Sequence, residues 1–261
     1  MNNPIITIIT VSFNAISIIE DTIKSVINQS YPNIEYIIVD GGSKDGTLDI
    51  IKKYKKNIAH IVCEPDKGIY DAMNKGINLA SGEWINFMNC GDSFYDANTI
   101  NQIVDAILEN KKVDIIYGNT IINSNVGKYL VLPENIENLS KHLPFCHQST
   151  FVRASLAKKN PFDLQYKFVA DYNFFFNAYK NNHSFYHLNK PVANYQIEEG
   201  FSASNMNKCI IEEHIINNTY ISSFAKFKNK LRSFLINNLP KKIVEHIRAT
   251  NYKTNPRFIK L

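Results

Sequence analysis

A single carboxylate, Asp92, ends the run Asn89-Cys90-Gly91-Asp92, which directly follows the mostly apolar residues 84–88. An apolar segment of this length predicts a buried strand. Asp92 would then lie at the carboxyl end of that strand, where open α/β sheets bind their ligands. Its hard oxygen atoms suit Mg²⁺ or Mn²⁺ holding a phosphate. A strand-to-helix turn with Asp92 as the helix cap explains the run as simply, so the rest of the chain must decide.

Three more polar side chains, Asn14, Asp40 and Asp66, lie just beyond β-rich apolar segments in the first half of the chain. Strands and amphipathic helices alternate here at short intervals, which is typical of βαβ units in a mostly parallel sheet. Because the carboxyl ends of parallel strands meet at one edge, a ligand cleft is expected there. The predicted strands are 5–11, 34–39, 58–62, 84–88 and 113–117, and the predicted helices are 17–28, 47–54, 69–79 and 98–110.

After Gly118 the alternation ends. Residues 128–132, 147–152 and 185–188 have the composition of strands, and residues 171–181 form a helical pattern rich in phenylalanine. This half is expected to be an α+β region that covers the cleft. A loop over the site is expected at Tyr195-Gln196 and Gly200-Phe201-Ser202.

Composition favours a globular protein, since 44% of the 261 residues are hydrophobic and 20% are charged. The four cysteines lie far apart, without a C-x-x-C pair, so neither a zinc site nor a disulfide framework is expected. No secretory signal and no apolar stretch long enough to span a bilayer are present, which makes the cytoplasm the expected compartment. Residues 221–261 carry ten basic residues and one acid; this segment is therefore +9 and the remainder −4, within a net charge of +5.

Known glycine-rich phosphate loops are missing from the chain. The turn after the first predicted strand is Ser12-Phe13-Asn14-Ala15 in place of G-x-G-x-x-G, and no Walker A lysine motif occurs. A phosphate ligand would therefore need a metal ion or positive side chains, which favours the metal interpretation of Asp92.

Several motifs, in this order and spacing, make the chain resemble the family 2 glycosyltransferases of bacterial polysaccharide or glycan assembly, which have the GT-A fold. They are Thr10-Val11-Ser12-Phe13-Asn14, Val39-Asp40-Gly41-Gly42-Ser43-Lys44-Asp45-Gly46-Thr47, Glu64-Pro65-Asp66-Lys67-Gly68-Ile69-Tyr70-Asp71-Ala72-Met73-Asn74-Lys75-Gly76, Ala80-Ser81-Gly82-Glu83-Trp84-Ile85 and Phe87-Met88-Asn89-Cys90-Gly91-Asp92. The resemblance implies an α/β fold with a mostly parallel central sheet flanked by helices. It divides the chain into a catalytic domain, 1–204, with a nucleotide-binding half, 1–118, and an acceptor half, 119–204, followed by a basic helical region, 205–261.

The resemblance also implies a nucleotide-sugar donor and an inverting displacement at the anomeric carbon. A carboxylate can accept the imide N–H of uracil, so Asp40 favours UDP; a turn-forming aspartate is the alternative. The alternative for Asp71 and Asn74 is that both lie on a solvated helix face. The alternative for Lys67 is that its side chain is only solvated. The residues expected to bind the nucleotide sugar in this half are Thr10, Ser12, Asn14, Asp40, Asp66, Lys67, Gly68, Asp71, Asn74, Asn89 and Gly91.

Asp92 matches the last acid of the metal motif of this family, whereas Gly91 stands where an acid usually precedes it. The diphosphate and water would complete the coordination shell of a divalent ion at Asp92, as Mg²⁺ tolerates. The ion would offset charge on the departing UDP. Asp171, in Phe168-Val169-Ala170-Asp171-Tyr172-Asn173-Phe174, matches the base that deprotonates the acceptor hydroxyl; helix capping is its alternative. His147 is expected to line the acceptor or touch the diphosphate, or else to be a buried structural histidine.

The basic C-terminal region has apolar residues at helical spacing over 224–239, interleaved with lysine and arginine, and a similar segment at 241–248. This pattern predicts peripheral binding to the inner face of the cell membrane, close to a polyprenyl-diphosphate-linked or other glycan acceptor. A homodimer contact and a solvated tail are the alternatives, and nucleic acid is not an expected partner. A polyprenyl-phosphate sugar synthase and a non-catalytic nucleotide-binding scaffold subunit remain the competing functions.

Overall fold

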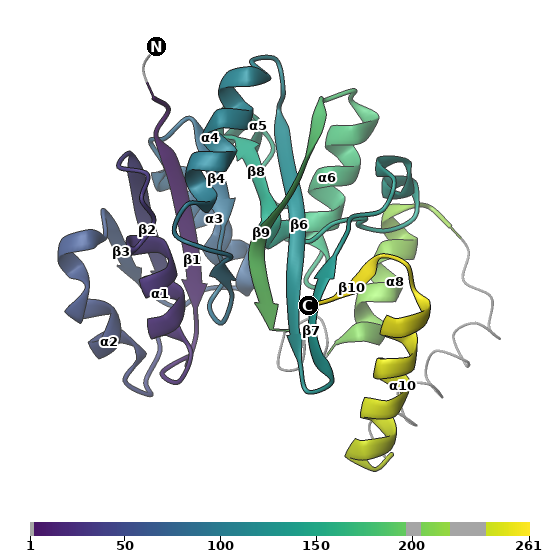
Figure 1. The fold of residues 1–261 in the computed structure, drawn as a ribbon. Coiled ribbons are helices and arrows are strands. Elements are labelled where there is room, and N and C mark those ends of the chain that lie inside the picture. The colour runs from purple at the N-terminus through teal and green to yellow at the C-terminus, as the bar shows by residue number, and fades with distance from the viewer. Residues whose placement is uncertain (1–2, 197–204, 220–238) are drawn as a thin grey trace.

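The fold comes from a computed structural model that describes residues 3–196, 205–219 and 239–261. Strands and helices alternate through its first half (Figure 1). Each strand and helix predicted between residues 5 and 110 begins and ends within two residues of the prediction, whereas η1 and β5 are additional elements. The agreement arises because apolar periodicity is strong in this half. The elements are β1 Ile6–Ser12, α1 Ile19–Ile27, β2 Ile34–Asp40, α2 Thr47–Lys53, η1 Lys55–Asn57, β3 His60–Cys63, α3 Ile69–Leu79, β4 Trp84–Phe87, β5 Ser93–Phe94 and α4 Thr99–Glu109.

The second half departs from the prediction at three strands. The strand predicted at 113–117 begins at Ile115 and continues to Ser124. Residues 147–149 form a 3₁₀ turn and not the start of a strand, since the Ser149 N–H donates to the Cys146 carbonyl over 3.1 Å. The short strand predicted at 185–188 continues to Gln196, passing Pro191 where its pairing with β6 is irregular. The elements are β6 Ile115–Ser124, β7 Gly127–Val131, η2 Ile136–Ser140, η3 His147–Ser149, β8 Thr150–Arg153, α5 Ala154–Lys159, α6 Ala170–Lys180, β9 Phe185–Gln196, α8 Met206–Ile216, α10 Lys241–Thr254 and β10 Phe258–Lys260.

One mixed sheet joins the two halves, in the order β10-β7-β6-β8-β4-β1-β2-β3. The predicted parallel arrangement is present in β4, β1, β2 and β3. In the second half β8 runs antiparallel to β4 and β6, and β7 runs antiparallel to β6, while β9 runs parallel along the other edge of β6. The parallel half places the carboxyl ends of four strands along one edge.

Apolar side chains of alternating strand residues form a core on each face of the sheet. Ile9 and Val11 of β1 belong to the core that packs under α3, α5 and α6, whereas Ile6 and Ile8 belong to the core under α1 and α4. All four are at most 6% exposed. Burial of a large aliphatic side chain contributes about 1.5–3 kcal/mol, so both faces stabilise the sheet that carries the loops of the site.

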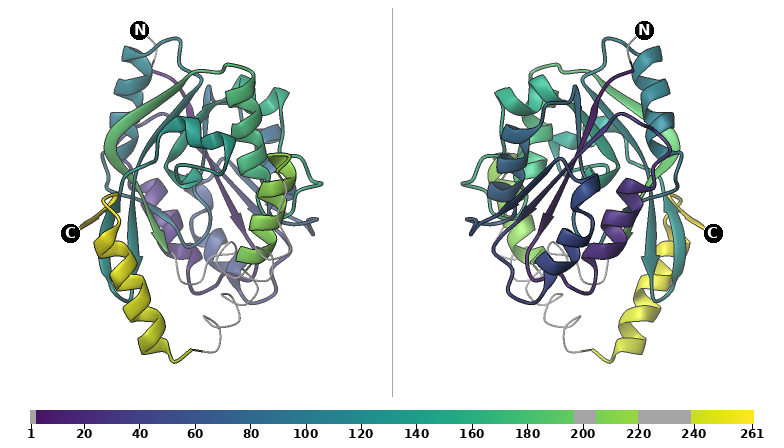
Figure 2. Two further views of the ribbon diagram at one scale, coloured as in Figure 1. Left: turned by 90° about the vertical axis from the view of Figure 1, so that its right-hand side faces the viewer. Right: turned by 90° about the vertical axis from the view of Figure 1, so that its left-hand side faces the viewer.

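The C-terminal region contains a strand in addition to the predicted helices. β10 pairs antiparallel with β7 and extends the edge of the sheet, and α10 lies beside this edge and projects past it (Figure 2). The helix predicted at 224–239 falls outside the described residues except for Leu239, and the 200–202 part of the predicted loop falls wholly outside them. The other part of that loop, Tyr195-Gln196, is the end of strand β9 and not a loop. None of the helices within the described ranges is long and apolar enough to cross a membrane.

Candidate active site

Asp40 closes the turn that follows β2. Its carboxylate is fully buried and accepts hydrogen bonds from the hydroxyls of Ser12 and Ser43, each over 2.7 Å, and from the N–H groups of Gly42 and Ser43. Ser12 lies opposite Asp40 in the pairing of β1 with β2. Asp40 therefore makes the turn in this structure and joins the ends of two adjacent strands.

Phe13, to which the sequence assigns no role, lies on the loop after β1. Its side chain is 65% exposed, and a Cβ atom added to Gly41 would lie 3.2 Å from its ring and 2.4 Å from Asp66 Oδ2. Asn14 holds this loop, since its Oδ1 accepts from Lys44 N–H over 3.0 Å. An aromatic face, a glycine and a carboxylate thus lie together at the edge where the strands end; Thr10 lies beneath, fully buried and bonded to the Met88 carbonyl. We call the three loops 12–14, 41–44 and 64–68 the donor edge.

The turn before α3 is built by its own acids. Asp66 Oδ1 accepts from Gly68 N–H over 2.8 Å, and Asp71 Oδ2 accepts from Lys67 N–H over 3.0 Å. The side chain of Asn74 bonds with both the N–H and the carbonyl of Phe162. Asp71 and Asn74 therefore support the loop and the packing of α3, while Lys67 and Gly68 are exposed at the donor edge.

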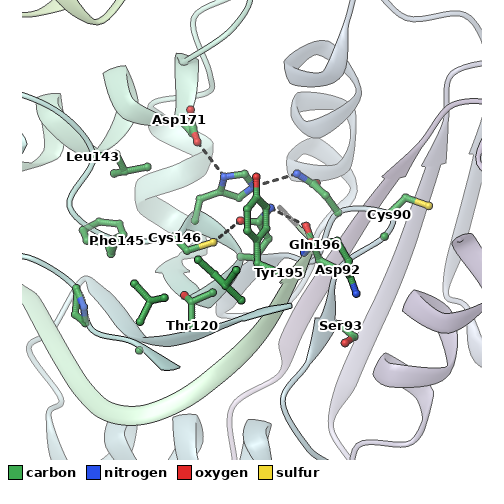
Figure 3. A pocket seen from close by; sticks show the side chains of 18 of the residues that line it. Cys90, Asp92, Ser93, Thr120, Leu143, Phe145, Cys146, Asp171, Tyr195 and Gln196 are labelled. Carbon is green, nitrogen blue, oxygen red and sulfur yellow. Dashed lines mark hydrogen bonds and ion pairs between the residues drawn. The ribbon is translucent and has the colours of Figure 1, made fainter. Parts of the chain in front are cut away.

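A cleft of about 810 Å³ opens beside the donor edge (Figure 3). The predicted residues that line it are Asn89, Gly91, Asp92, His147 and Asp171. The other predicted binding residues lie outside its wall, but Ile69 and Tyr70, which directly follow Gly68, contribute to it. The start of α3 thus connects the donor edge to the cleft.

Asp92 is buried at the floor of this cleft. Its Oδ2 accepts from Gln148 Nε2 over 2.7 Å, and its Oδ1 accepts from Gln196 N–H over 3.2 Å. Burial raises the pKa of Asp92 to about 6, although these hydrogen bonds oppose the rise. A carboxylate that is costly to ionise without a partner favours a bound cation.

Gly91 has a backbone conformation that explains why an acid is missing there. Its φ is +96°, a left-handed conformation that strains residues with a Cβ atom. Its N–H donates to Thr22 Oγ1, and the Thr22 hydroxyl donates to the Asp92 carbonyl over 2.8 Å. The Thr22 side chain of α1 thereby holds the 91–92 turn in a form that glycine adopts most readily.

Asp171 lies in the first turn of α6, whose N-cap residue is Val169, so it does not cap the helix with its side chain. Instead Glu212 of α8 accepts from the N–H groups of Phe168 and Val169, over 2.8 and 3.1 Å. Asp171 is 9% exposed, and its carboxylate accepts from Tyr70 OH over 2.7 Å. Tyr70 is another residue to which the sequence assigns no role, although it lies inside a quoted motif.

His147 bridges Asp171 and Asn89. Its Nδ1 lies 2.9 Å from Asp171 Oδ2, and its Nε2 lies 3.0 Å from Asn89 Nδ2. Burial alone would raise the pKa of Asp171, but hydrogen bonding and charge from His147, with the Tyr70 hydroxyl, hold that pKa below its ordinary value. Asp171 is therefore ionised at neutral pH and reaches the cleft as a potential proton acceptor (Figure 3).

The cleft offers few protein ligands for a divalent ion. Within the described part of the chain no group of three histidine, cysteine or acidic side chains could hold a metal. Asp92 is a buried carboxylate with a raised pKa, and the nearby Asn89 Oδ1 is buried without a hydrogen-bond partner among the described residues. These oxygen atoms suit Mg²⁺ or Mn²⁺ only if ligands from a diphosphate and water complete the shell.

The parallel strand ends and the acidic cleft beside them define an α/β fold with a ligand-binding edge. Residues 7–179 match the profile of Glycosyl transferase family 2, and the chain belongs to this family. It is 32% identical to "PGL/p-HBAD biosynthesis glycosyltransferase" of Mycobacterium bovis over 69% of this chain and 72% of that one, and 25% identical to "Putative teichuronic acid biosynthesis glycosyltransferase TuaG" of Bacillus subtilis over 87% and 85%. The chain is a glycosyltransferase.

Solved structures share the fold. TarS 1-349 of S. aureus, in complex with UDP-GlcNAc, matches 95% of this chain and 79% of its own with a TM-score of 0.63 and 18% identity. The mannosyltransferase PcManGT of Pyrobaculum calidifontis, in complex with GDP-Man and Mn²⁺, matches 98% and 72% with a TM-score of 0.64 and 16% identity. At these identities the likeness concerns the fold alone.

Proposed function

We propose that this glycosyltransferase moves a hexosyl or N-acetylhexosaminyl unit from a UDP-sugar to a hydroxyl of a glycan or lipid-linked oligosaccharide, with inversion at the anomeric carbon. The observation that carries the proposal is the pair of buried carboxylates, Asp92 and Asp171, at one cleft beside the donor edge. One acid is suited to the diphosphate side of the sugar and the other to the acceptor side, as an in-line displacement requires.

The nucleotide is assigned to the donor edge. Phe13 offers an exposed ring on which a base can stack, and Gly41 and Asp66 lie beside it. Asp40 and Ser12 support this surface from below through their mutual hydrogen bond. The TarS structure with UDP-GlcNAc and the PcManGT structure with GDP-Man are consistent with a nucleotide sugar, and we take uridine as the base from the sequence.

The cleft itself provides little positive charge for the diphosphate. It is lined by Asp21, Asp92 and Asp171, and the Arg257 guanidinium in its wall is paired with Glu134. We therefore assign a divalent ion to Asp92, with Asn89 at hand, and bound there it would act as a Lewis acid that offsets charge on the departing UDP.

Asp171 acts as the general base in this proposal. It takes the proton of the acceptor hydroxyl while the acceptor oxygen forms a bond to the anomeric carbon on the face opposite UDP. The bond between that carbon and the diphosphate oxygen breaks, and its electron pair leaves with UDP. Attack from the opposite face inverts the anomeric configuration.

The test combines donor choice, stereochemistry and a matched pair of variants. UDP release should be measured with UDP-glucose, UDP-galactose and their N-acetylated forms in Mn²⁺, and the product linkage should be β by NMR from an α-linked donor.

Asp171→Asn should lower kcat by about 10²–10⁴-fold and leave UDP affinity unchanged. Asp114→Asn, which alters an aspartate that also accepts from a histidine but lies outside the cleft wall, should retain activity. An α-linked product, or full turnover in Asp171→Asn, would contradict the mechanism.

Peripheral docking on the inner face of the membrane belongs to the same proposal, because a lipid-linked acceptor resides there. Within the described residues the observation in its favour is α10, where Ile243 and Ile247 are 45% and 42% exposed, one helical turn apart. Lys242 and Lys253 on the same helix are also exposed, and a basic helix with an apolar stripe suits an anionic lipid surface.

A further inference from the structure

His147 makes one hydrogen bond with each ring nitrogen, and both partners belong to the cleft. Nδ1 lies 2.9 Å from Asp171 Oδ2 and Nε2 lies 3.0 Å from Asn89 Nδ2. Both Asn89 and Asp171 line the cleft, as does the imidazole itself. We propose that His147 is a positioning residue for the base: its imidazole fixes the carboxylate of Asp171 toward the acceptor hydroxyl. The inference rests on the proposed role of Asp171 as base.

The carboxylate of Asp171 is held at both oxygens. Tyr70 OH donates to Oδ1 over 2.7 Å, while the imidazole of His147 contacts Oδ2. The two donors come from different elements, α3 and η3, so the carboxylate plane is fixed by groups outside its own helix. A carboxylate has about four acceptor positions, so an acceptor hydroxyl can still donate to Asp171 when both are bound.

The burial of Asp171 makes the hydrogen bond from His147 important. Asp171 is 9% exposed, and burial by itself would raise its pKa, whereas the hydrogen bonds from His147 and Tyr70 lower it. Without the imidazole, the same burial would favour the protonated form of the base.

The amide of Asn89 fixes the tautomer of the imidazole. Its Nδ2 lies 3.0 Å from Nε2. Because an amide nitrogen can only donate, Nε2 accepts this bond, and the ring hydrogen lies on Nδ1, where it is donated to Asp171 Oδ2.

The chemical step leaves His147 unchanged. The proton leaves the acceptor oxygen and binds Asp171, the freed electron pair forms the new carbon–oxygen bond, and the pair of the broken bond leaves with UDP. His147 keeps its Nδ1–H throughout and donates it to Asp171, so its contribution is orientation and electrostatics.

The test compares His147→Ala and His147→Asn with a matched control, His183→Asn. His183 Nδ1 also lies 3.0 Å from an aspartate oxygen, Asp114 Oδ2, but this pair lies outside the cleft wall. All rates are measured at saturating Mn²⁺ and UDP-sugar, as kcat against pH, with the Kd for UDP and the thermal midpoint of each variant. The asparagine variant can keep a donor near the position of Nδ1 while it removes the imidazole ring.

His147→Ala should lower kcat by about 10–100-fold, as expected for a misplaced base, and leave the Kd for UDP within twofold. Its acid limb of kcat should move to higher pH, because Asp171 loses the hydrogen bond that lowers its pKa. His147→Asn should recover part of the rate and part of the position of the acid limb, and His183→Asn should match the unsubstituted enzyme. A kcat within twofold in His147→Ala, or a fall in kcat with the acid limb unmoved in both His147 variants, would overturn the inference. Full turnover in Asp171→Asn would instead overturn the base assignment of the proposed function.

Discussion

His147 and Gln148 are neighbours on one 3₁₀ turn, and each holds one of the buried carboxylates of the cleft. His147 contacts Asp171 over 2.9 Å, and Gln148 donates to Asp92 over 2.7 Å. Asp171 and Asp92 belong to different halves of the chain and have no element in common. The turn therefore sets the relative position of the proposed base and the proposed metal ligand, and any shift of η3 should affect both.

Gln148→Leu should weaken metal binding more than it slows the chemical step. The variant removes the donor to Asp92 Oδ2, and loss of such an outer hydrogen bond typically lowers metal affinity by about 10–100-fold. The Mn²⁺ concentration for half-maximal UDP release should rise accordingly, whereas kcat at saturating Mn²⁺ should change less. Gln165→Leu is the control, because Gln165 is exposed and bonded to Asp163. An unchanged Mn²⁺ requirement in Gln148→Leu would argue against Asp92 as the ligand.

Asp92→Asn should stabilise the protein in the absence of metal and donor, and more so at higher pH. The folded pKa of Asp92 is raised from 3.8 to about 6 by burial, so the penalty for its charge is complete above pH 6 and disappears as the pH falls toward 3.8. The difference corresponds to about 3 kcal/mol at pH 8 and about half of that at pH 5. Urea unfolding in EDTA at the two pH values measures it. Equal stabilities of variant and parent at pH 8 would contradict the burial argument.

The sequence predicts the first half of this fold well because strand and helix periods are unambiguous there. Ile69–Leu79, for example, is predicted at its observed bounds. It predicts the second half less well, since residues 147–149 have a strand-like composition but turn through local hydrogen bonds. Strand β9 passes Pro191, a residue that usually ends a strand, because the irregular pairing with β6 accommodates it.

From the sequence, residues of the candidate site could be predicted only where they match a motif. Asp92, Asp171 and His147 are predicted at the cleft, and all three line it. The partners that hold them, Gln148 and Tyr70, could not be chosen from sequence alone because their contacts join residues 56 and 101 positions apart. Such pairs depend on how the two halves of the sheet meet.

Phe13→Ala should weaken UDP binding without affecting the fold. The ring is 65% exposed, so its removal costs little burial, whereas stacking of a base on an aromatic side chain is worth about 1–3 kcal/mol. Calorimetric titration of UDP should show a loss of this size, and Phe13→Tyr should retain affinity because it keeps the ring. Tyr95→Ala serves as the control for an exposed aromatic outside the cleft wall. If Phe13→Ala binds UDP with the affinity of the parent, the base does not stack on the loop after β1.

Membrane docking should depend on the apolar stripe of α10. Truncation before α10 is unsuitable as a test, because it also removes β10, which pairs with β7 and places Phe258 in the wall of the cleft. The double variant Ile243→Ser/Ile247→Ser keeps β10 and removes two exposed apolar side chains, each of which would contribute up to about 1.5–3 kcal/mol if buried in lipid. Cosedimentation with phosphatidylglycerol vesicles should fall at least tenfold, while UDP release stays at the parent level. Leu164→Ser, at an exposed apolar residue of another surface, should bind as the parent does. Undiminished cosedimentation of the double variant would show that α10 does not dock this glycosyltransferase on the membrane.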